Sequence, residues 1–560
     1  MVVGGYPPSR HFLSDLGMEA EVTSESTAKV RIPVTPYVTG PDGGVRVGVL
    51  ATLVDVVGGS AALRSLHPDW MATADLALQV VRPAVGPYVE ARATVLRRGR
   101  TTLVVEALVF DVDYDGSDMD HDGSGTDGTD GAGSPAAWAS MTFAVLPGRD
   151  TNPMQDVSSE LPVRWALTGS GLEGPVDDVL SISVDDAASG VVSLPMRAYL
   201  RNSFGAVQGG VMATLGEVAT VEMLGADVGF EGVPVVTDLQ VAYLALGRVG
   251  PIVSRSRRLD AGGPTSTGSA VVELLDRGAD DRLTTVISVD RRHAVGEYLR
   301  LERWDVPAPP GSDLFEIGGR APLDAHQMGA GGGLRTGALL TSVDSLGGFL
   351  CGLSVHPEWI VTTSMMATIA HLSHRGPLRL HGRILRRGRN AVVAALDVVD
   401  EGLADRAVAA ITMTSAVLDP GTMDLPVTRP FAIPMGPPDP DAPPPEEFFC
   451  IEPGTGSVTR LELAERLRNP WGILHGGAVA MLFDVAACRA VDGRDGGTGR
   501  SAAAADTVIH YLRPIKVGPV EARCRVLGGG PGRTLVRVAV HDMGADARLA
   551  TMGTVAVLSV

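Results

Sequence analysis

One pattern occurs four times along this chain of 560 residues and constrains the fold more than any other feature. Each occurrence begins with a Gly-rich turn and continues into an apolar run, in which a polar residue is followed nine positions later by an acid. Because the residues around each acid are apolar on nearly all sides, each run is predicted to be a buried helix. The four polar–acid pairs are Arg46 and Asp55, Gln208 and Glu217, Arg335 and Asp344, and His475 and Asp484.

Segments rich in Val, Leu and Thr follow each predicted helix, with turn residues between them. In the fourth repeat, four such segments begin at Thr507, Val520, Thr534 and Ala550. This pattern is typical of consecutive antiparallel strands. A helix of about five turns followed by several strands predicts a sheet that wraps around the helix.

The repeats alternate between two types. The first and third (A-type) share a His-Pro-acid-Trp motif, which ends at Trp70 and Trp359, and an Arg-Arg-Gly-Arg motif. The second and fourth (B-type) share a Gly-Gly pair and an Asn six residues before the polar position, Asn202 and Asn469. This order predicts that a two-repeat unit was duplicated.

We expect repeat domains at residues 10–148, 160–296, 312–420 and 446–560, with a Pro-rich linker at 421–445. An acidic insertion at 111–135 falls inside the last hairpin of the first repeat. It partly imitates a calcium loop, but the twelfth position is Asp and helices do not flank it. We therefore expect a disordered acidic loop there and no metal site.

The bulk composition excludes several classes of protein. Asp and Glu outnumber Lys and Arg by 65 to 47, and a net charge of −18 argues against broad nucleic-acid binding. No run of about 18 apolar residues predicts a membrane span, and the N-terminus does not resemble a signal peptide. The four cysteines lack zinc spacing, so we expect reduced thiols and a cytoplasmic location.

The spacing between turn and acid indicates how a site could form. The amides of His475 and Gly476 would lie at a helix start, where unpaired N–H groups and the helix dipole stabilise negative charge. Asp484 lies nine residues on, which is about 13.5 Å along the axis and about 180° around it. It therefore cannot act on the same carbonyl as its own helix start, and we expect composite sites shared between repeats.

Residues 469–484, NPWGILHGGAVAMLFD, resemble the signature of PaaI-type hotdog-fold acyl-CoA thioesterases. The likeness is strong in the fourth repeat, fair in the second, and extends over nearly the whole chain by repetition. It implies an α+β fold of four hotdog domains, each a long central helix wrapped by an antiparallel sheet, forming two tandem double hotdogs. It also implies hydrolysis of acyl-CoA thioesters, with CoA as part of the substrate and no separate cofactor.

The same resemblance assigns roles to individual residues. B-type repeats would supply the oxyanion side, and A-type repeats would supply an acid and a Thr on the following strand. The A-type repeats have Gly40 and Gly329 where the Asn should be, so each unit is expected to keep one complete site. The candidates are Asp55 and Thr73 with Asn202, Gln208 and Gly209, and Asp344 and Thr362 with Asn469, His475 and Gly476.

Glu217 and Asp484 remain candidate catalytic acids of a second site in each unit, although they would face the degenerate A-type turns. CoA phosphates require cations, and the family binds them near a turn that is rich in arginine here. The candidates for this role are Arg97, Arg98 and Arg100, Arg386, Arg387 and Arg389, and Arg533.

Plainer interpretations stay open for each group. His475 could simply cap its helix, the buried acids could form structural pairs, the threonines could be ordinary strand residues, and the arginines could be solvated turn charges. A non-catalytic acyl-CoA binding protein and a hotdog hydratase or dehydratase are the alternative functions. We expect pseudo-dimers within the chain, and association of whole chains stays open.

Overall fold

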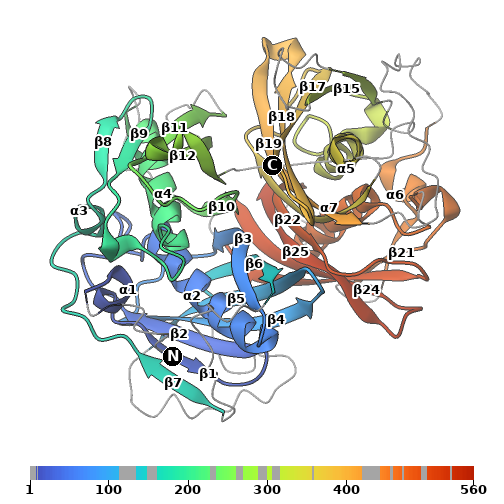
Figure 1. The fold of residues 1–560 in the computed structure, drawn as a ribbon. Coiled ribbons are helices and arrows are strands. Elements are labelled where there is room, and N and C mark those ends of the chain that lie inside the picture. The colour runs from blue at the N-terminus through green and yellow to red at the C-terminus, as the bar shows by residue number, and fades with distance from the viewer. Residues whose placement is uncertain are drawn as a thin grey trace. The chain divides into compact units, whose positions relative to one another are not determined.

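The structure is a computed structural model, and the chain divides into two compact units, Met1–Ile287 and Ser288–Val560 (Figure 1). Most of the predicted acidic insertion (113–133) and of the predicted linker (421–441) lies outside the described residues. The described residues are 8, 10–112, 134–147, 161–226, 235–259, 269–287, 299, 301–305, 316–355, 358–418, 442–454, 458–469, 472–492, 501–529 and 532–560.

Four long helices correspond to the four predicted apolar runs, and each begins two residues after the start of its run, at Val45, Val207, Leu334 or Leu474. They are α2 (Val47–Leu66), α4 (Gly209–Gly225), α5 (Thr336–Val355) and α7 (Gly476–Asp492). The residues just before each helix are extended because an isolated β-bridge holds them, as between Thr39 and Val45. Three short helices complete the set: α1 (Phe12–Asp15), α3 (Val176–Leu180) and α6 (Pro445–Phe448).

The first unit contains one antiparallel sheet of 13 strands among its described residues, in the order β7-β1-β2-β4-β5-β6-β3-β10-β13-β12-β11-β9-β8. Its strands are β1 (Glu19–Val22), β2 (Thr27–Pro33), β3 (Trp70–Val80), β4 (Tyr88–Arg98), β5 (Thr102–Val112), β6 (Ala137–Leu146), β7 (Val163–Ala166), β8 (Ser183–Asp186), β9 (Val191–Leu194), β10 (Asp238–Tyr243), β11 (Ile252–Arg258), β12 (Ala270–Asp276) and β13 (Arg282–Ile287).

The second unit contains a sheet of 12 described strands with the same plan, in the order β14-β15-β17-β18-β19-β16-β22-β25-β24-β23-β21-β20. Its strands are β14 (Glu302–Asp305), β15 (Glu316–Ala321), β16 (Trp359–Ile369), β17 (Leu378–Arg387), β18 (Ala391–Asp400), β19 (Arg406–Leu418), β20 (Ile451–Pro453), β21 (Val458–Leu461), β22 (Ala502–Tyr511), β23 (Val520–Gly528), β24 (Arg533–Asp542) and β25 (Arg548–Ser559).

In each unit the two repeats join edge to edge through one antiparallel strand pair. β3 pairs with β10, where Leu76 lies opposite Val241, and β16 pairs with β22, where Met365 lies opposite Ile509. Each repeat alone would expose a strand edge, and this pairing satisfies the edge hydrogen bonds. The prediction of two tandem double hotdogs is confirmed.

One strand lies on the other side of a predicted boundary. β7 falls within the range assigned to the second repeat, 160–296, but it pairs with β1 and so extends the sheet edge of the first repeat. The chain thus crosses back over the first repeat before it enters the second. This connection depends on pairing between distant segments, which local sequence patterns do not report.

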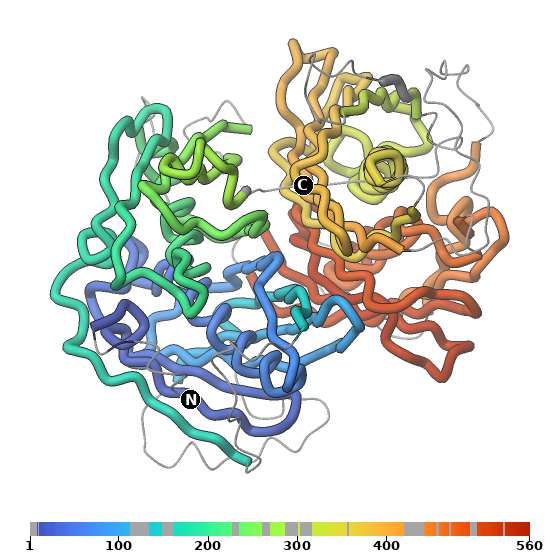
Figure 2. The backbone as a smooth tube through the Cα atoms, viewed as in Figure 1, coloured from blue at the N-terminus to red at the C-terminus, as the bar shows by residue number. Residues whose placement is uncertain are grey.

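The central helices owe their length and hydropathy to burial inside the sheets. α2 and α5 are each 20 residues long with a hydropathy of 1.5, enough by length and composition alone to cross a membrane. In the structure 67% and 72% of the most apolar 18-residue stretches of α2 and α5 are buried. Figure 2 shows α5 end-on with strands around it. A helix that is apolar all round is accounted for by such a core position.

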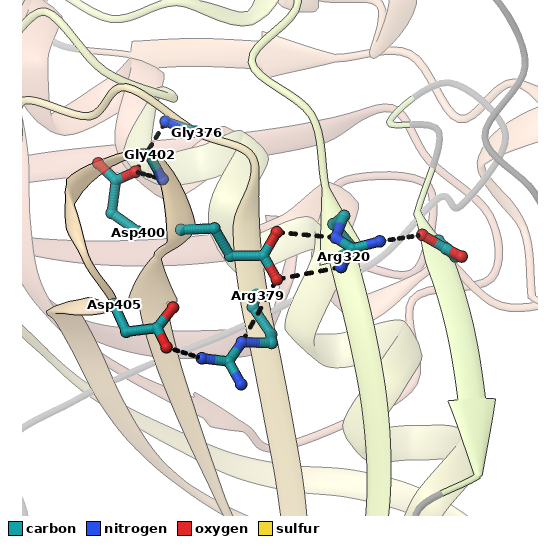
Figure 3. Close-up of polar contacts among 8 residues, drawn as sticks. Arg320, Gly376, Arg379, Asp400, Gly402 and Asp405 are labelled. Carbon is teal, nitrogen blue, oxygen red and sulfur yellow. Dashed lines mark hydrogen bonds and ion pairs between the residues drawn. The ribbon is translucent and has the colours of Figure 1, made fainter.

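A buried aspartate fixes the turn before β17 in the second unit. Asp400 accepts hydrogen bonds from the amides of Gly376 and Gly402 at 2.8 and 3.0 Å (Figure 3). It also accepts from the amide of Arg375 at 2.8 Å, and its side chain has no exposed surface. Nearby Asp405 forms an ion pair with Arg379 at 2.6 Å, but the Asp405 side chain is 58% exposed.

These two aspartates give a matched pair of variants. Asp400→Asn is expected to lower the free energy of unfolding of the second unit by about 1–3 kcal/mol, because its NH₂ group would face a buried backbone N–H. Asp405→Asn is expected to cost less than about 1 kcal/mol, since exposed ion pairs contribute little. Urea unfolding of both variants compares them, and equal losses would contradict this account of the turn.

Candidate active site

Each unit brings two helices together so that the start of one lies against the middle of the other. α2 packs against α4, and α5 packs against α7. An acid nine residues after a helix start lies near the middle of its helix. Each helix pair therefore forms two contacts between a helix start and a partner acid. We call these the glycine-turn sites, at the starts of α4 and α7, and the arginine-turn contacts, at the starts of α2 and α5.

The glycine-turn site of the first unit joins Asp55, Thr73 and Gly209. Thr73 Oγ1 donates to Asp55 Oδ1 at 2.9 Å. A methyl group added at Gly209 would lie 2.9 Å from Asp55 Oδ2, so the carboxylate lies directly beside the helix start. The Tyr243 hydroxyl donates to the Gly209 carbonyl at 3.0 Å and holds this turn from the side of β10.

The second unit repeats the arrangement with Asp344, Thr362 and Gly476. Thr362 Oγ1 donates to Asp344 Oδ1 at 3.0 Å, and a methyl group at Gly476 would lie 2.6 Å from Asp344 Oδ2. The Tyr511 hydroxyl donates to the Gly476 carbonyl at 3.0 Å. Two units of different sequence thus build the same constellation from the predicted residues.

The helix starts at these two sites are open. In the described part of the chain, no oxygen accepts from the backbone amide of Gly209 or Gly476. An unpaired amide at the positive end of a helix is a strong donor toward developing negative charge. The site therefore places a carboxylate beside a backbone N–H that has no acceptor in the described part of the chain, and such an N–H can donate to a carbonyl oxygen.

The arginine-turn contacts differ, because a carboxylate already occupies the helix start. Glu217 accepts from the amides of Val47 and Gly48 at 3.1 Å each. In the second unit, Asp484 Oδ2 accepts from the amide of Gly337 at 2.6 Å. The structure thus places the candidate catalytic acids Glu217 and Asp484 in contact with the A-type turns.

The polar residues before α4 and α7 differ between the units. His475 Nδ1 lies 3.2 Å from Asp344 Oδ2 and 3.1 Å from the Gly477 amide, which donates to it. Nδ1 accepts from Gly477 when it lacks a proton, and it pairs with Asp344 when protonated. Gln208, which precedes α4, is buried and makes no side-chain cap. His475 therefore has both contacts in the structure: it caps α7 through the Gly477 amide, and it lies beside the Asp344 carboxylate.

The two asparagines shape the turns. Asn202 Oδ1 accepts from the amides of Phe204 and Ala206, and Asn469 Oδ1 accepts from the amide of Ile473. No hydrogen bond joins Asn202 to Asp55 among the described residues. The asparagines act on the geometry of the helix start, and a direct role on an oxyanion stays a prediction.

The arginine clusters lie at the hairpins that join β4 to β5, β17 to β18, and β23 to β24. Arg98 donates to the Ser65 carbonyl, and Arg387 donates to the Ser354 carbonyl at 2.9 Å. Both carbonyls lie in the last turn of a central helix, where a cation also complements the helix dipole. One arginine of each A-type cluster therefore has a structural contact. Arg100, Arg386 and Arg389 are exposed, and Arg97 and Arg533 are partly buried.

Two tyrosines at the glycine-turn sites, Tyr243 and Tyr511, were not predicted from the sequence. Both occur in the strand after a B-type helix, 34 and 35 positions after Gly209 and Gly476. Aligning these two strands, ending in VAY and IHY, would have found them. Burial raises the pKa of both hydroxyls well above the ordinary value, so they remain protonated donors to the turn.

The pKa of Asp55 yields a prediction for pH dependence. Burial raises it from 3.8 to about 6, and the Thr73 hydrogen bond partly opposes this rise. A carboxylate that takes a proton from water must be ionised, so any kcat/KM that depends on Asp55 is expected to fall as pH drops below about 6. Thr73→Val should move this limb to higher pH. The profile is measured in an Asp344→Asn background, and an unshifted limb would exclude the Thr73 contact.

The fold defines a hotdog protein with paired repeats, and comparisons with known proteins give the family. The profile described as Thioesterase superfamily matches residues 45–115 and 472–545. The chain is 37% identical over 115 residues to a Halobacterium salinarum protein named "Putative esterase", covering 19% of this chain and 75% of that protein. A Saccharolobus solfataricus protein with the same description is 30% identical over 108 residues, covering 19% and 70%.

Among solved structures, a Bacillus halodurans protein crystallised with CoA is 27% identical, covers 20% of this chain and 74% of that chain, and has a TM-score of 0.19. The family assignment rests on the two esterase relatives, since each match is at least 30% identical and spans most of the relative. The chain belongs to the thioesterase superfamily.

Proposed function

We propose that the chain hydrolyses acyl-CoA thioesters to the free acid and CoA at the two glycine-turn sites. One observation carries the proposal: a carboxylate held by a Thr lies beside an open helix start from the partner repeat, in both units. Membership of the thioesterase superfamily supports the reaction class.

In the proposed mechanism, the thioester carbonyl oxygen accepts from the Gly209 or Gly476 amide. Asp55 or Asp344 removes a proton from water, which attacks the carbonyl carbon. The negative charge that develops on the carbonyl oxygen is stabilised by the amide and the helix dipole. The C–S bond then breaks, the protonated Asp55 or Asp344 gives its proton to the sulfur, and CoA leaves as the thiol. Direct attack by the carboxylate on the carbonyl carbon is the alternative first step.

Thr73 and Thr362 hold one carboxylate oxygen, so the other oxygen faces the glycine turn. His475 would add a second polar group on the carbonyl side in the second unit, where the first unit has Gln208. The exposed arginines of the A-type clusters, with Arg533, are the proposed contacts for CoA phosphates. The four cysteines are free thiols, which supports the proposed cytoplasmic location.

The test measures release of free thiol from short-chain, long-chain and aromatic acyl-CoAs by the wild-type chain. Hydrolysis of at least one class, with saturation kinetics, is the expected result. Matched acyl-pantetheine thioesters, which lack the nucleotide phosphates, should show a higher KM. Binding of acyl-CoA without thiol release would favour the non-catalytic alternative, and hydration of crotonyl-CoA would favour a hydratase.

A further inference from the structure

The two arginine-turn contacts share an ion-pair network that a catalytic site would not require. In the first unit Arg46 Nη2 lies 3.4 Å from Glu217 Oε2, and Arg46 Nη1 lies 2.6 Å from Asp177 in α3. One cation thus joins the acid of the partner helix to an acid from the segment that leads into that repeat.

The second unit has the same three-part network. Arg335 Nε lies 2.9 Å from Asp484 Oδ1, and Arg335 Nη1 lies 2.5 Å from Glu446 in α6. α6 lies at the start of the fourth repeat and precedes its long helix α7, as α3 precedes α4 in the second repeat. The network therefore occurs at equivalent places in both units, which an accidental surface ion pair would not do.

Burial gives the network its strength. The side chains of Glu217 and Asp484 are 6% and 2% exposed, whereas Asp177 and Glu446 are about one-third exposed. A buried carboxylate is costly unless it is paired and hydrogen-bonded. Here two kinds of donor satisfy it, the amides of the helix start and the guanidinium.

The same contacts leave no place for a thioester carbonyl. Its oxygen would need the amides that Glu217 and Asp484 already occupy. A cavity of about 190 Å³ remains beside Asp484, lined by Arg335, Cys488 and the turn at 329–333. Its lining includes the Asp484 carboxylate, which repels a developing oxyanion, and the Arg335 guanidinium there is already paired with Asp484 and Glu446.

The helices between the two contacts are in close approach. A methyl group at Gly48 would lie 2.5 Å from Thr214, and one at Gly210 would lie 2.1 Å from Thr52 Oγ1. In the second unit Thr341 Oγ1 donates to the Gly477 carbonyl of the partner helix. Because the two helices are in tight contact, fixing their relative position at one end of the pair also fixes it at the other end.

We infer that Glu217 with Arg46 and Asp484 with Arg335 are structural interlocks, which close the second composite site of each unit and fix the helix pair. Each double hotdog then has one working site, and four repeats supply two. The number of working sites rests on the proposed function. The interlock itself does not, and stability measurements test it separately.

The first arm is a thermal double-mutant cycle on the full chain, with Arg46→Gln, Glu217→Gln and the double variant. Each single change is expected to lower the melting temperature of the first unit by about 5 °C or more, because it leaves a buried partner unpaired. The double change should cost clearly less than the sum. The exposed pair Arg277 and Asp281, which lies in the same unit, is the control cycle and should show little coupling. Additive losses at Arg46 and Glu217 would overturn the interlock.

The second arm measures thiol release. The variant Glu217→Gln/Asp484→Asn should keep most of the wild-type kcat at a temperature where it is folded. A different result would show that Glu217 and Asp484 are catalytic: this variant would lose as much activity as Asp55→Asn/Asp344→Asn, with no lower melting temperature. If the wild-type chain hydrolyses nothing, the proposed function fails, and the thermal cycle alone decides the interlock.

Discussion

A chain carrying both Asp55→Asn and Asp344→Asn is expected to hydrolyse thioesters at least about 10²-fold more slowly than wild type, since general-base help contributes roughly 10²–10⁴. Each single variant should keep the activity of the other unit. Asparagine has the shape of aspartate and accepts from Thr73 or Thr362 through its oxygen, so the turn geometry is retained. The measurement is thiol release under saturating and limiting substrate.

The double variant is expected to fold normally. Burial raises the pKa of Asp55, so ionisation of this carboxyl opposes folding and its replacement by a neutral group removes that cost. The folded state binds this proton more tightly than the unfolded chain, and its contribution to stability falls as pH rises from about 4 to about 6. Asp281→Asn/Asp405→Asn is the control, since these turn residues have left-handed φ values that asparagine tolerates. Equal loss in the control would contradict the assignment.

Gly476→Ala is expected to lower kcat of the second unit by about 10²-fold. Its methyl group would lie 2.6 Å from Asp344 Oδ2 and 3.0 Å from Cγ, so the carboxylate must move away from the helix start. Displacement by about 1 Å is enough for an effect of this size. The measurement uses an Asp55→Asn background, in which only the second unit contributes.

The matched control for this change lies in the same helix pair. A methyl group at Gly348 in α5 meets nothing within 4 Å, so Gly348→Ala should leave kcat unchanged and favour the helix. Wild-type kcat in Gly476→Ala would mean that the carboxylate does not work from this position. A melting temperature of Gly476→Ala below the assay temperature would indicate misfolding and not displacement of the carboxylate.

Local patterns in the sequence determined the repeats, the four central helices and the double-hotdog architecture. The nine-residue spacing also indicated that each acid lies at the start of a partner helix, because about two and a half turns separate it from the start of its own helix. The predicted partners Asp55 and Gly209, and Asp344 and Gly476, lie together in the structure. Periodicity and turn residues are local properties, and regular helix geometry converts a spacing along the chain into a direction in space.

Only the tertiary structure decided which helix starts are open. The missing Asn in the A-type turns favoured Asp55 and Asp344, but all four repeats have the same polar–acid spacing, so the sequence also kept Glu217 and Asp484 as candidates for a second site. The difference comes from contacts over long separations, such as Arg46 with Asp177, 131 positions apart. The contacts of Tyr243 in β10 and Tyr511 in β22 with the glycine turns are likewise contacts between residues far apart in the sequence. Such contacts depend on how sheets and helices pack, and that packing is set by the whole unit and not by any one segment.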